Sequence, residues 1–201
     1  MARKNADERR AEIIEATLAM ADEVGPDRLS IDQVAQRVGV TQPAIFKHFP
    51  SKQALWDAVG GFVGGQLEST WQKALAGNSD PADQLRALMR AQLRLVRSLP
   101  AIPALLFSRE LQAGNQGLRR TFLGLMQRFH DVLAGVLADG IRSGHFRPDL
   151  DHSRAAYVVI TLVQGVAMRW SLSGRGFDLV KEGERLLDVV LQGLLADGVG
   201  A

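Results

Sequence analysis

Polar and basic side chains that can bind an anion gather between Thr41 and Lys52 of this 201-residue chain. Lys47 and Lys52 are cations, and the hydroxyl of Thr41 and the amide of Gln42 can donate hydrogen bonds. The stretch from Gln33 to Trp56 contains no aspartate or glutamate. This combination favours a polyanionic partner, such as the phosphate backbone of a nucleic acid.

Two short helices are expected to position these side chains. Ser30 followed by Gln33 is a capping box, so the first helix begins at Ile31. Gly39 suits the left-handed residue that ends a helix. A second helix follows from Thr41, which can cap it, to His48. Two short helices joined this closely predict a helix-turn-helix, a motif that binds DNA.

The rest of the chain keeps a helical spacing of apolar residues, and we find no run of alternating strands joined by hairpin turns. We therefore predict an all-α protein of about nine helices. After the helix-turn-helix, the expected helices cover approximately residues 51–76, 80–98, 103–113, 118–143, 153–171 and 179–195. Residues 1–52 would form a three-helix head and residues 53–201 a helical body, with the helix from 51 to 76 bridging the two.

Several positions near the amino end match one family pattern: Ile13, Ala16, Ala21, Gly25, Ser30, Val34, Ala35, Gly39, Val40 and the run from Phe46 to Lys52. In these features the first 55 residues or so resemble the DNA-binding region of the tetracycline-repressor (TetR/AcrR) family of bacterial transcription regulators. The family's commonest pattern has tyrosine where this chain has Phe46. The missing hydroxyl removes one phosphate hydrogen bond, so operator affinity would lean more on lysines and backbone amides.

The resemblance implies a homodimeric repressor of a pseudo-palindromic double-stranded operator. The DNA-binding candidates are Ser30, Thr41, Gln42, Pro43, Ala44, Phe46, Lys47, His48 and Lys52. The Gln42 amide can pair with adenine, whereas Pro43 and Ala44 offer contacts to thymine methyl groups. Lys52 is the first-ranked phosphate anchor, because a cation in the first turn of a helix is unfavourable unless an anion lies nearby.

An alternative for the two lysines is ordinary solvated surface charge. The basic tail Arg3-Lys4 could add a minor-groove or phosphate contact, or could be solvated and disordered.

The body is expected to bind a small, mostly apolar effector. The candidate lining is Trp56, Phe62, Met89, Leu93, Phe107, Phe122, Met126, Phe129 and Trp170, with polar candidates Arg97, Glu110, Gln127, His130 and Gln164. The alternative is that these residues are ordinary core. Gly60, Gly61, Gly64 and Gly65 would soften the bridging helix and form a bending point between effector and head; close packing or an interrupted helix explains them equally well.

The last two expected helices are apolar over more of their circumference than a monomer's surface helix needs. A two-fold homodimer would cover them through a four-helix interface, as the resemblance also implies. The interface candidates are Ala156, Val159, Val163, Leu187, Val190 and Leu194, and small residues such as Gly165 would let helices approach closely. The alternative is that both helices are central to a monomeric core.

Composition agrees with an intracellular, cytoplasmic protein. The chain has no cysteine, a net charge of +2 and no uninterrupted apolar run near the roughly 20 residues that span a bilayer. No nucleophile elbow, phosphate-binding glycine loop or zinc-hydrolase motif occurs, so we expect neither an enzyme nor a cofactor. His145 and His152, with Asp149 and Asp151 between them, lack the spacing of a closed zinc site, and no metal is expected. A regulator without a small-molecule effector, controlled by a protein partner, is the main alternative function.

Overall fold

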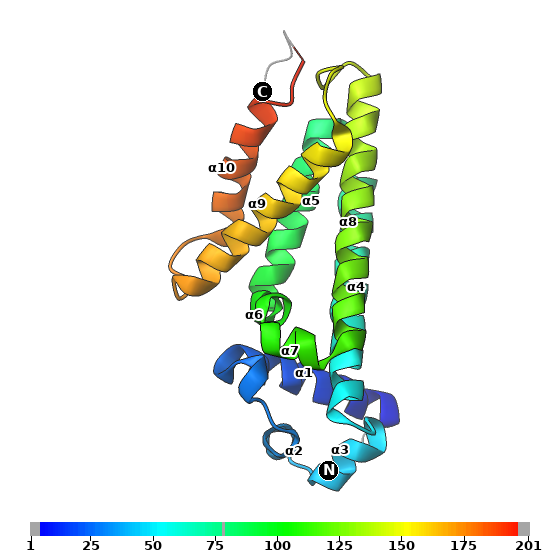
Figure 1. The fold of residues 1–201 in the computed structure, drawn as a ribbon, viewed down its shortest axis with the longest axis vertical. Coiled ribbons are helices and arrows are strands. Elements are labelled where there is room, and N and C mark those ends of the chain that lie inside the picture. The colour runs from blue at the N-terminus through cyan, green and yellow to red at the C-terminus, as the bar shows by residue number, and fades with distance from the viewer. Residues whose placement is uncertain (1–4, 78, 197–201) are drawn as a thin grey trace. The chain divides into compact units, whose positions relative to one another are not determined.

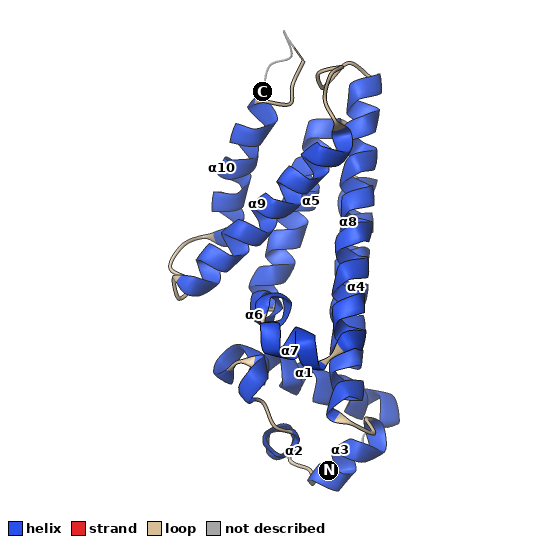
Figure 2. Cartoon of the chain, in the orientation of Figure 1, coloured by secondary structure: helices blue, strands red, loops and turns tan. Residues whose placement is uncertain are grey.

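The computed structural model describes residues 5–77 and 79–196, which form ten α-helices and one short 3-10 helix (Figures 1 and 2). The predicted all-α class is confirmed. Arg3 and Lys4 lie outside the described residues. The helices form two compact units: one contains the residues up to Gly65 together with Leu99–Leu123, and the other contains Gln66–Ser98 and the residues from Gly124 onward.

The first unit is built around its amino-terminal helix. It contains α1 (Ala6–Val24), η1 (Pro26–Arg28), α2 (Ile31–Val38), α3 (Gln42–His48), the first part of α4 (Lys52–Ala76), α6 (Ala101–Phe107), α7 (Arg109–Gly114) and the start of α8 (Gln116–Arg142). Helix α1 packs against α2, α3 and α6. Its residues Ile13 and Leu18 are buried, as are Val34 of α2 and Ile45 of α3.

The predicted boundaries of the helix-turn-helix are confirmed. The Ser30 hydroxyl accepts a hydrogen bond from the Gln33 backbone at 3.2 Å, and the Gln33 amide oxygen accepts one from the Ser30 backbone at 2.9 Å. Gly39 ends α2 with φ 73°, a left-handed conformation that glycine adopts without strain. Thr41 is the N-cap residue of α3, as predicted, with an extended backbone, but its side chain makes no capping hydrogen bond.

The helix expected between Pro103 and Ala113 is divided in two. It breaks at Ser108, whose hydroxyl accepts a hydrogen bond from the backbone of Leu111 at 3.0 Å and so begins α7. Helix α4, in contrast, continues through all four of its glycines. A Cβ at Gly60 would lie 2.7 Å from Cδ1 of Leu118, which identifies a close approach to α8.

The second unit contains the end of α4, α5 (Pro81–Ser98), most of α8, α9 (His152–Leu172) and α10 (Leu179–Gln192). Helix α5 packs against both α9 and α10. The approach to α10 is close at Gly183, where a Cβ would lie 2.1 Å from Cδ1 of Leu93. The ring of Trp71 stacks on Phe129 with centroids 4.8 Å apart, and its Nε1 donates to the Gln92 amide at 2.7 Å.

Among the described helices, α9 is long and apolar enough to cross a membrane by the criteria of length and composition, with a mean hydropathy of 1.3 over its most apolar window. The core helix of a soluble protein meets the same criteria. In this unit α9 packs against α5 and α10. Other apolar residues of α9, Tyr157 and Val158 among them, stay exposed.

Candidate functional site

Helix α3 presents a polar and basic surface opposite its buried side. Ile45 is fully buried, which fixes the face of α3 that turns to the core. The neighbouring positions Gln42, Pro43 and Lys47 are exposed, and Phe46 is 39% exposed. Ala44 and His48 are half-buried, and Thr41 at the start of the helix is exposed. The α3 surface therefore brings together an amide, a cation and an aromatic edge, which suit base edges and phosphates.

Two of the DNA-binding candidates also hold the helix-turn-helix together. The acceptor side of the Ser30 hydroxyl is used in the capping box of α2. Lys52, at the first position of α4, donates from Nζ to the backbone carbonyl of Leu29, the residue before Ser30. An ammonium group has three protons, so Lys52 can hold this carbonyl and still meet a phosphate. The sequence predicted the phosphate contact but not the hydrogen bond to Leu29.

The stretch from Gln33 to Trp56 carries less net positive charge than its composition suggests. Arg37 of α2 forms an exposed ion pair with Glu23 of α1. The hydrogen bond from Arg37 lowers the pKa of the Glu23 carboxyl and raises the pKa of the guanidinium. Arg37 is therefore partly neutralised, and Lys47 and Lys52 carry the net positive charge of this surface.

The candidate ligand-lining residues do not all share one environment. Phe107 is 41% exposed, whereas Phe62 and Met126 are half-buried and Phe122 and Trp170 are buried. Met89 and Leu93 are fully buried beside Gly183, where α5 meets α10, so they are core residues of the second unit. Phe129 is occupied by its stack on Trp71. These three side chains are packed among residues of the second unit, and their role in ligand binding stays a prediction.

Trp56 differs from the other candidates because its polar atom lacks a partner. The side chain is 1% exposed, and Nε1 is the single buried side-chain nitrogen or oxygen without a hydrogen bond in the described part of the chain. An unsatisfied buried donor costs about 1–3 kcal/mol. Native structures retain such donors rarely, which marks Trp56 as a residue able to bind an acceptor from outside the chain.

The polar candidates are mostly engaged with protein groups or exposed. His130 is buried between α8 and α9, with Nε2 3.0 Å from the Ser153 hydroxyl and Nδ1 3.1 Å from the Asp131 carboxylate. Gln127 donates to the same carboxylate at 2.9 Å. Arg97 and Glu110 are exposed, and Gln164 is half-buried. Within the described ranges no group of three or more histidine, cysteine, aspartate or glutamate residues could hold a metal ion.

The predicted dimer residues lie mainly on the inner side of their helices. Ala156, Val159 and Leu187 are fully buried inside the chain, and Val163 and Leu194 are 5% and 8% exposed. A second chain could not reach them without separating α9 and α10 from the core. Periodicity had identified a real apolar stripe, but the stripe faces the protein's own core, and of the six Val190 alone is half-buried.

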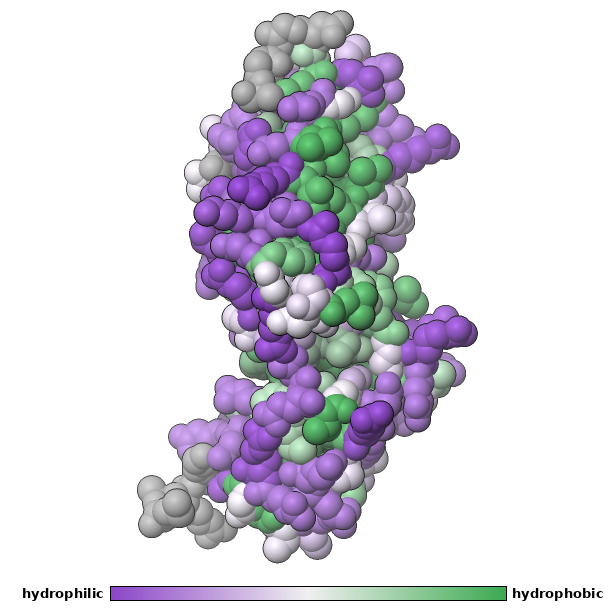
Figure 3. All heavy atoms as spheres, turned by 90° about the vertical axis from the view of Figure 1, so that its left-hand side faces the viewer, coloured by the Kyte–Doolittle hydropathy of each residue, from purple (hydrophilic) through white to green (hydrophobic). Residues whose placement is uncertain are grey.

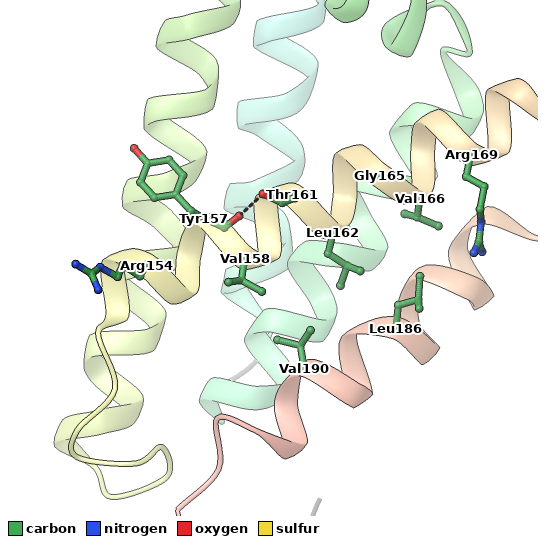
Figure 4. A pocket seen from close by; sticks show the side chains of 10 residues that line it. All are labelled: Arg154, Tyr157, Val158, Thr161, Leu162, Gly165, Val166, Arg169, Leu186 and Val190. Atoms are coloured by element: carbon green, nitrogen blue, oxygen red, sulfur yellow. Dashed lines mark hydrogen bonds between the residues drawn. The ribbon is translucent and has the colours of Figure 1, made fainter.

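The exposed apolar surface lies on the adjacent side of the same two helices. Tyr157, Val158 and Val189 are each exposed by half or more. Arg154, Tyr157, Val158, Thr161, Leu162, Gly165, Val166 and Arg169 of α9 and Leu186 and Val190 of α10 line a groove of about 520 Å³. We call this surface the α9–α10 face. Figure 4 shows its aliphatic side chains lying between the two helices, with an arginine at either end.

The surrounding surface supports this description. In Figure 3, hydrophobic atoms gather in a band at the height of α9 and α10, bordered by hydrophilic residues. Gly165 has no other atom within 4 Å of a Cβ built on it, so the backbone of another helix could approach closely there.

Comparisons with known proteins agree with the geometry of both units. Residues 13–59 match the family described as bacterial regulatory proteins, tetR family, and residues 63–193 match the YsiA-like protein C-terminal region. The HTH-type transcriptional repressor KstR2 of Mycobacterium tuberculosis is 26% identical over 193 residues, 95% of each chain. The fatty acid metabolism regulator protein of Bacillus subtilis is 22% identical, covering 91% of this chain and 94% of its own.

Solved structures share the fold. The ketosteroid transcriptional regulator KstR2 of M. tuberculosis superimposes with a TM-score of 0.78 at 22% identity, covering 94% of this chain and 96% of its own. FadR from B. subtilis in complex with stearoyl-CoA gives 0.79 at 20% identity, with coverages of 91% and 98%. Another relative, the nucleoid occlusion factor SlmA of Vibrio cholerae, is 26% identical over 81% of this chain and 83% of its own.

Proposed function

The chain belongs to the TetR family of bacterial regulatory proteins and is a DNA-binding transcriptional regulator, and we propose that it is a homodimeric repressor released from a pseudo-palindromic operator by a small, mostly apolar ligand. We also propose that residues 1–52 act as the DNA-binding head and residues 53–201 as the ligand-binding and dimerisation body, with α4 bridging the two. Such a regulator acts in the cytoplasm, where its operator is.

The single observation that carries the proposal is the surface of α3. A short helix, preceded by a capped helix and a left-handed glycine, exposes Gln42 and Lys47 and has no acidic neighbour from Gln33 to Trp56. In the major groove Gln42 would read a base edge, while Lys47 and Lys52 would bind phosphates. Thr41, Pro43, Ala44, Phe46 and His48 would complete the contact.

The ligand proposal is supported by Trp56 and by two related proteins. The buried indole N–H of Trp56 would donate to an acceptor on a ligand otherwise bound by apolar contacts. FadR from B. subtilis is solved in complex with stearoyl-CoA, which carries a long acyl chain, and KstR2 is a ketosteroid regulator. Both relatives favour a ligand with a large apolar part.

The dimer proposal is supported by the α9–α10 face. A contiguous exposed apolar surface is a common sign of an interface. Two copies of this face would pack as four helices, with Val158, Gly165 and Val189 at the contact in place of the buried residues that the sequence suggested. A dimer would carry two α3 helices to the two halves of the operator.

One relative supports a second candidate function. SlmA is a nucleoid occlusion factor, not a regulator of metabolism by name. A DNA-binding protein of this kind could be controlled by a protein partner and need no small ligand. Thermal-shift screening separates the two, because a ligand that binds the folded state raises the melting temperature by mass action.

Selection of bound fragments from genomic DNA tests the function directly. The fragments should share a pseudo-palindrome, and Gln42→Ala should relax the base preference at one position in each half. Lys52→Ala should weaken operator and random duplex alike and reduce the salt dependence. A wild-type protein without preference for any fragment would overturn the proposed function.

A further inference from the structure

A cation on α1 reaches the carboxyl end of α3. Nη1 of Arg10 donates a hydrogen bond to the backbone carbonyl of His48, the last residue of α3. Carbonyls in the last turn of a helix have no partner within the helix, and the helix dipole gives this end a partial negative charge. Arg10 therefore supplies both the missing donor and a favourable charge.

The same guanidinium also contacts Phe49, the residue that directly follows α3. It lies over the ring of Phe49, with 4.4 Å between the guanidinium carbon and the ring centroid. Phe49 is 2% exposed, and its backbone N–H donates to the Ile45 carbonyl at 3.0 Å. The planar guanidinium can stack and donate at once, which an ammonium group cannot do with the same geometry.

Helix α3 has particular need of such support. It is seven residues long, and helices of this length are not stable alone in water. Its amino end lacks a side-chain cap, since the Thr41 hydroxyl makes no capping hydrogen bond. The buried side chain of Ile45 fixes the middle of the helix, and the contacts of Arg10 fix the end.

We propose that Arg10 is a positioning residue for operator recognition, which sets the direction of α3 from its carboxyl end and does not itself bind DNA. The inference rests on the proposed role of α3 as the reading helix. A small rotation of α3 would separate Gln42 from its base edge, while Lys47 and Lys52 would still find phosphates. Loss of Arg10 should therefore reduce sequence preference more than general DNA affinity.

The test compares Arg10→Ala with the matched control Arg9→Ala. Arg9 is adjacent on α1 but pairs with Glu12 of its own helix at 2.7 Å. Affinities are measured by fluorescence anisotropy for a fragment selected by the wild-type protein and for a random duplex, at several salt concentrations. Arg10→Ala should weaken operator binding about tenfold, as for loss of a hydrogen bond to a charged group, with random-duplex affinity and salt slope unchanged. Arg9→Ala should match the wild type.

Further measurements separate positioning from general loss of structure. Hydrogen exchange in Arg10→Ala should accelerate in the amides of α3 and stay unchanged in α1. Arg10→Lys keeps a donor for the His48 carbonyl but loses the planar stack, so it should recover part of the operator preference, and it serves as the test if Arg10→Ala does not fold.

Three results would overturn the proposal. If Arg10→Ala kept the operator preference of the wild type, α3 would need no such support. If Arg10→Ala does not fold, the same result in Arg10→Lys would lead to the same conclusion. A salt slope smaller by about 0.9 for each phosphate that the variant no longer binds would make Arg10 a phosphate ligand instead. Equal weakening of operator and random duplex would show a general effect. Absence of any operator preference in the wild type would instead refute the proposed function, independently of Arg10.

Discussion

The carboxylate of Asp27 accepts a hydrogen bond from the hydroxyl of Ser108, 81 positions further along the chain. It also accepts one from the backbone N–H of Leu111 at 3.1 Å. Asp27 lies in η1, directly before the helix-turn-helix, and Ser108 begins α7. One carboxylate thus joins the segment that enters α2 to the amino end of a helix in the same unit.

Removal of this carboxylate should destabilise the protein. Asp27→Ala should lower the free energy of unfolding by about 1–2 kcal/mol, because it removes two hydrogen bonds and the negative charge at the start of α7. Urea unfolding of Asp27→Ala, Ser108→Ala and the double variant measures the effect. The two losses should not add, because the residues are in direct contact; strictly additive losses would contradict the interaction.

The helix-turn-helix could be predicted from sequence because its determinants are local. Ser30 and Gln33 are three positions apart, and Gly39 acts through its own backbone. The contacts that hold this motif in place are distant in sequence: Arg10 to His48 and Lys52 to Leu29. Nothing in the sequence pairs an arginine with one particular carbonyl, so these contacts required the structure.

The residues proposed for the dimer interface show a different limit of sequence-based prediction. Val158 and Val159 are adjacent valines on α9, yet one is 50% exposed and the other fully buried. Helical periodicity shows that α9 has an apolar surface wider than one stripe, but the side that faces the core depends on how α5 and α10 pack. Gly183, where α10 approaches Leu93 of α5 closely, was not among the small residues that the sequence pattern indicated.

A charge on the α9–α10 face should prevent dimerisation. Val158→Glu would place a carboxylate in the proposed apolar contact, so it should be monomeric by light scattering and should bind the operator about a hundredfold more weakly than the wild type. Leu123→Glu is the matched control, because Leu123 is 53% exposed but lies on α8 in the other unit. A monomeric wild type, or a fully dimeric Val158→Glu, would contradict the proposed interface.

The aspartates at the amino ends of α9 and α10 should make the stability of the protein depend on pH in the acidic range. Asp151 and Asp178 cap these helices, and hydrogen bonds from the backbones of Arg154 and Lys181 respectively are the largest causes that lower the two pKa values. Because the folded pKa values are depressed, the stabilisation is complete above the unfolded value of about 3.9 and is lost as the pH falls through the lower folded values.

The Asp178→Asn variant isolates one of these carboxylates. Its melting temperature should fall less steeply than that of the wild type as the pH decreases below about 4, since asparagine caps the helix without titrating. Thermal unfolding monitored by circular dichroism between neutral and acidic pH provides the comparison. Parallel curves for variant and wild type would remove Asp178 from the acid response.

Trp56→Phe should separate ligand binding from stability. Without ligand, its melting temperature should equal or exceed that of the wild type, because the substitution removes a buried donor that has no partner. The rise in melting temperature caused by an operator-releasing metabolite should be smaller in this variant. Trp71→Phe is the control: it leaves the buried Gln92 without its partner, so stability should fall while the ligand response persists. An undiminished ligand response in Trp56→Phe would exclude the indole N–H from the site.

The glycines of α4 should matter for the response to ligand more than for the fold. The boundary between the two units crosses α4 directly after Gly65, and a Cβ at Gly61 or Gly65 would meet no atom within 4 Å. Replacing both with alanine should stabilise the helix by about 1 kcal/mol per site and, if α4 bends there, reduce operator release by ligand. Gly135→Ala, an equally open site on α8, should add similar stability with normal release. Normal release in the Gly61→Ala, Gly65→Ala variant would exclude bending at these glycines.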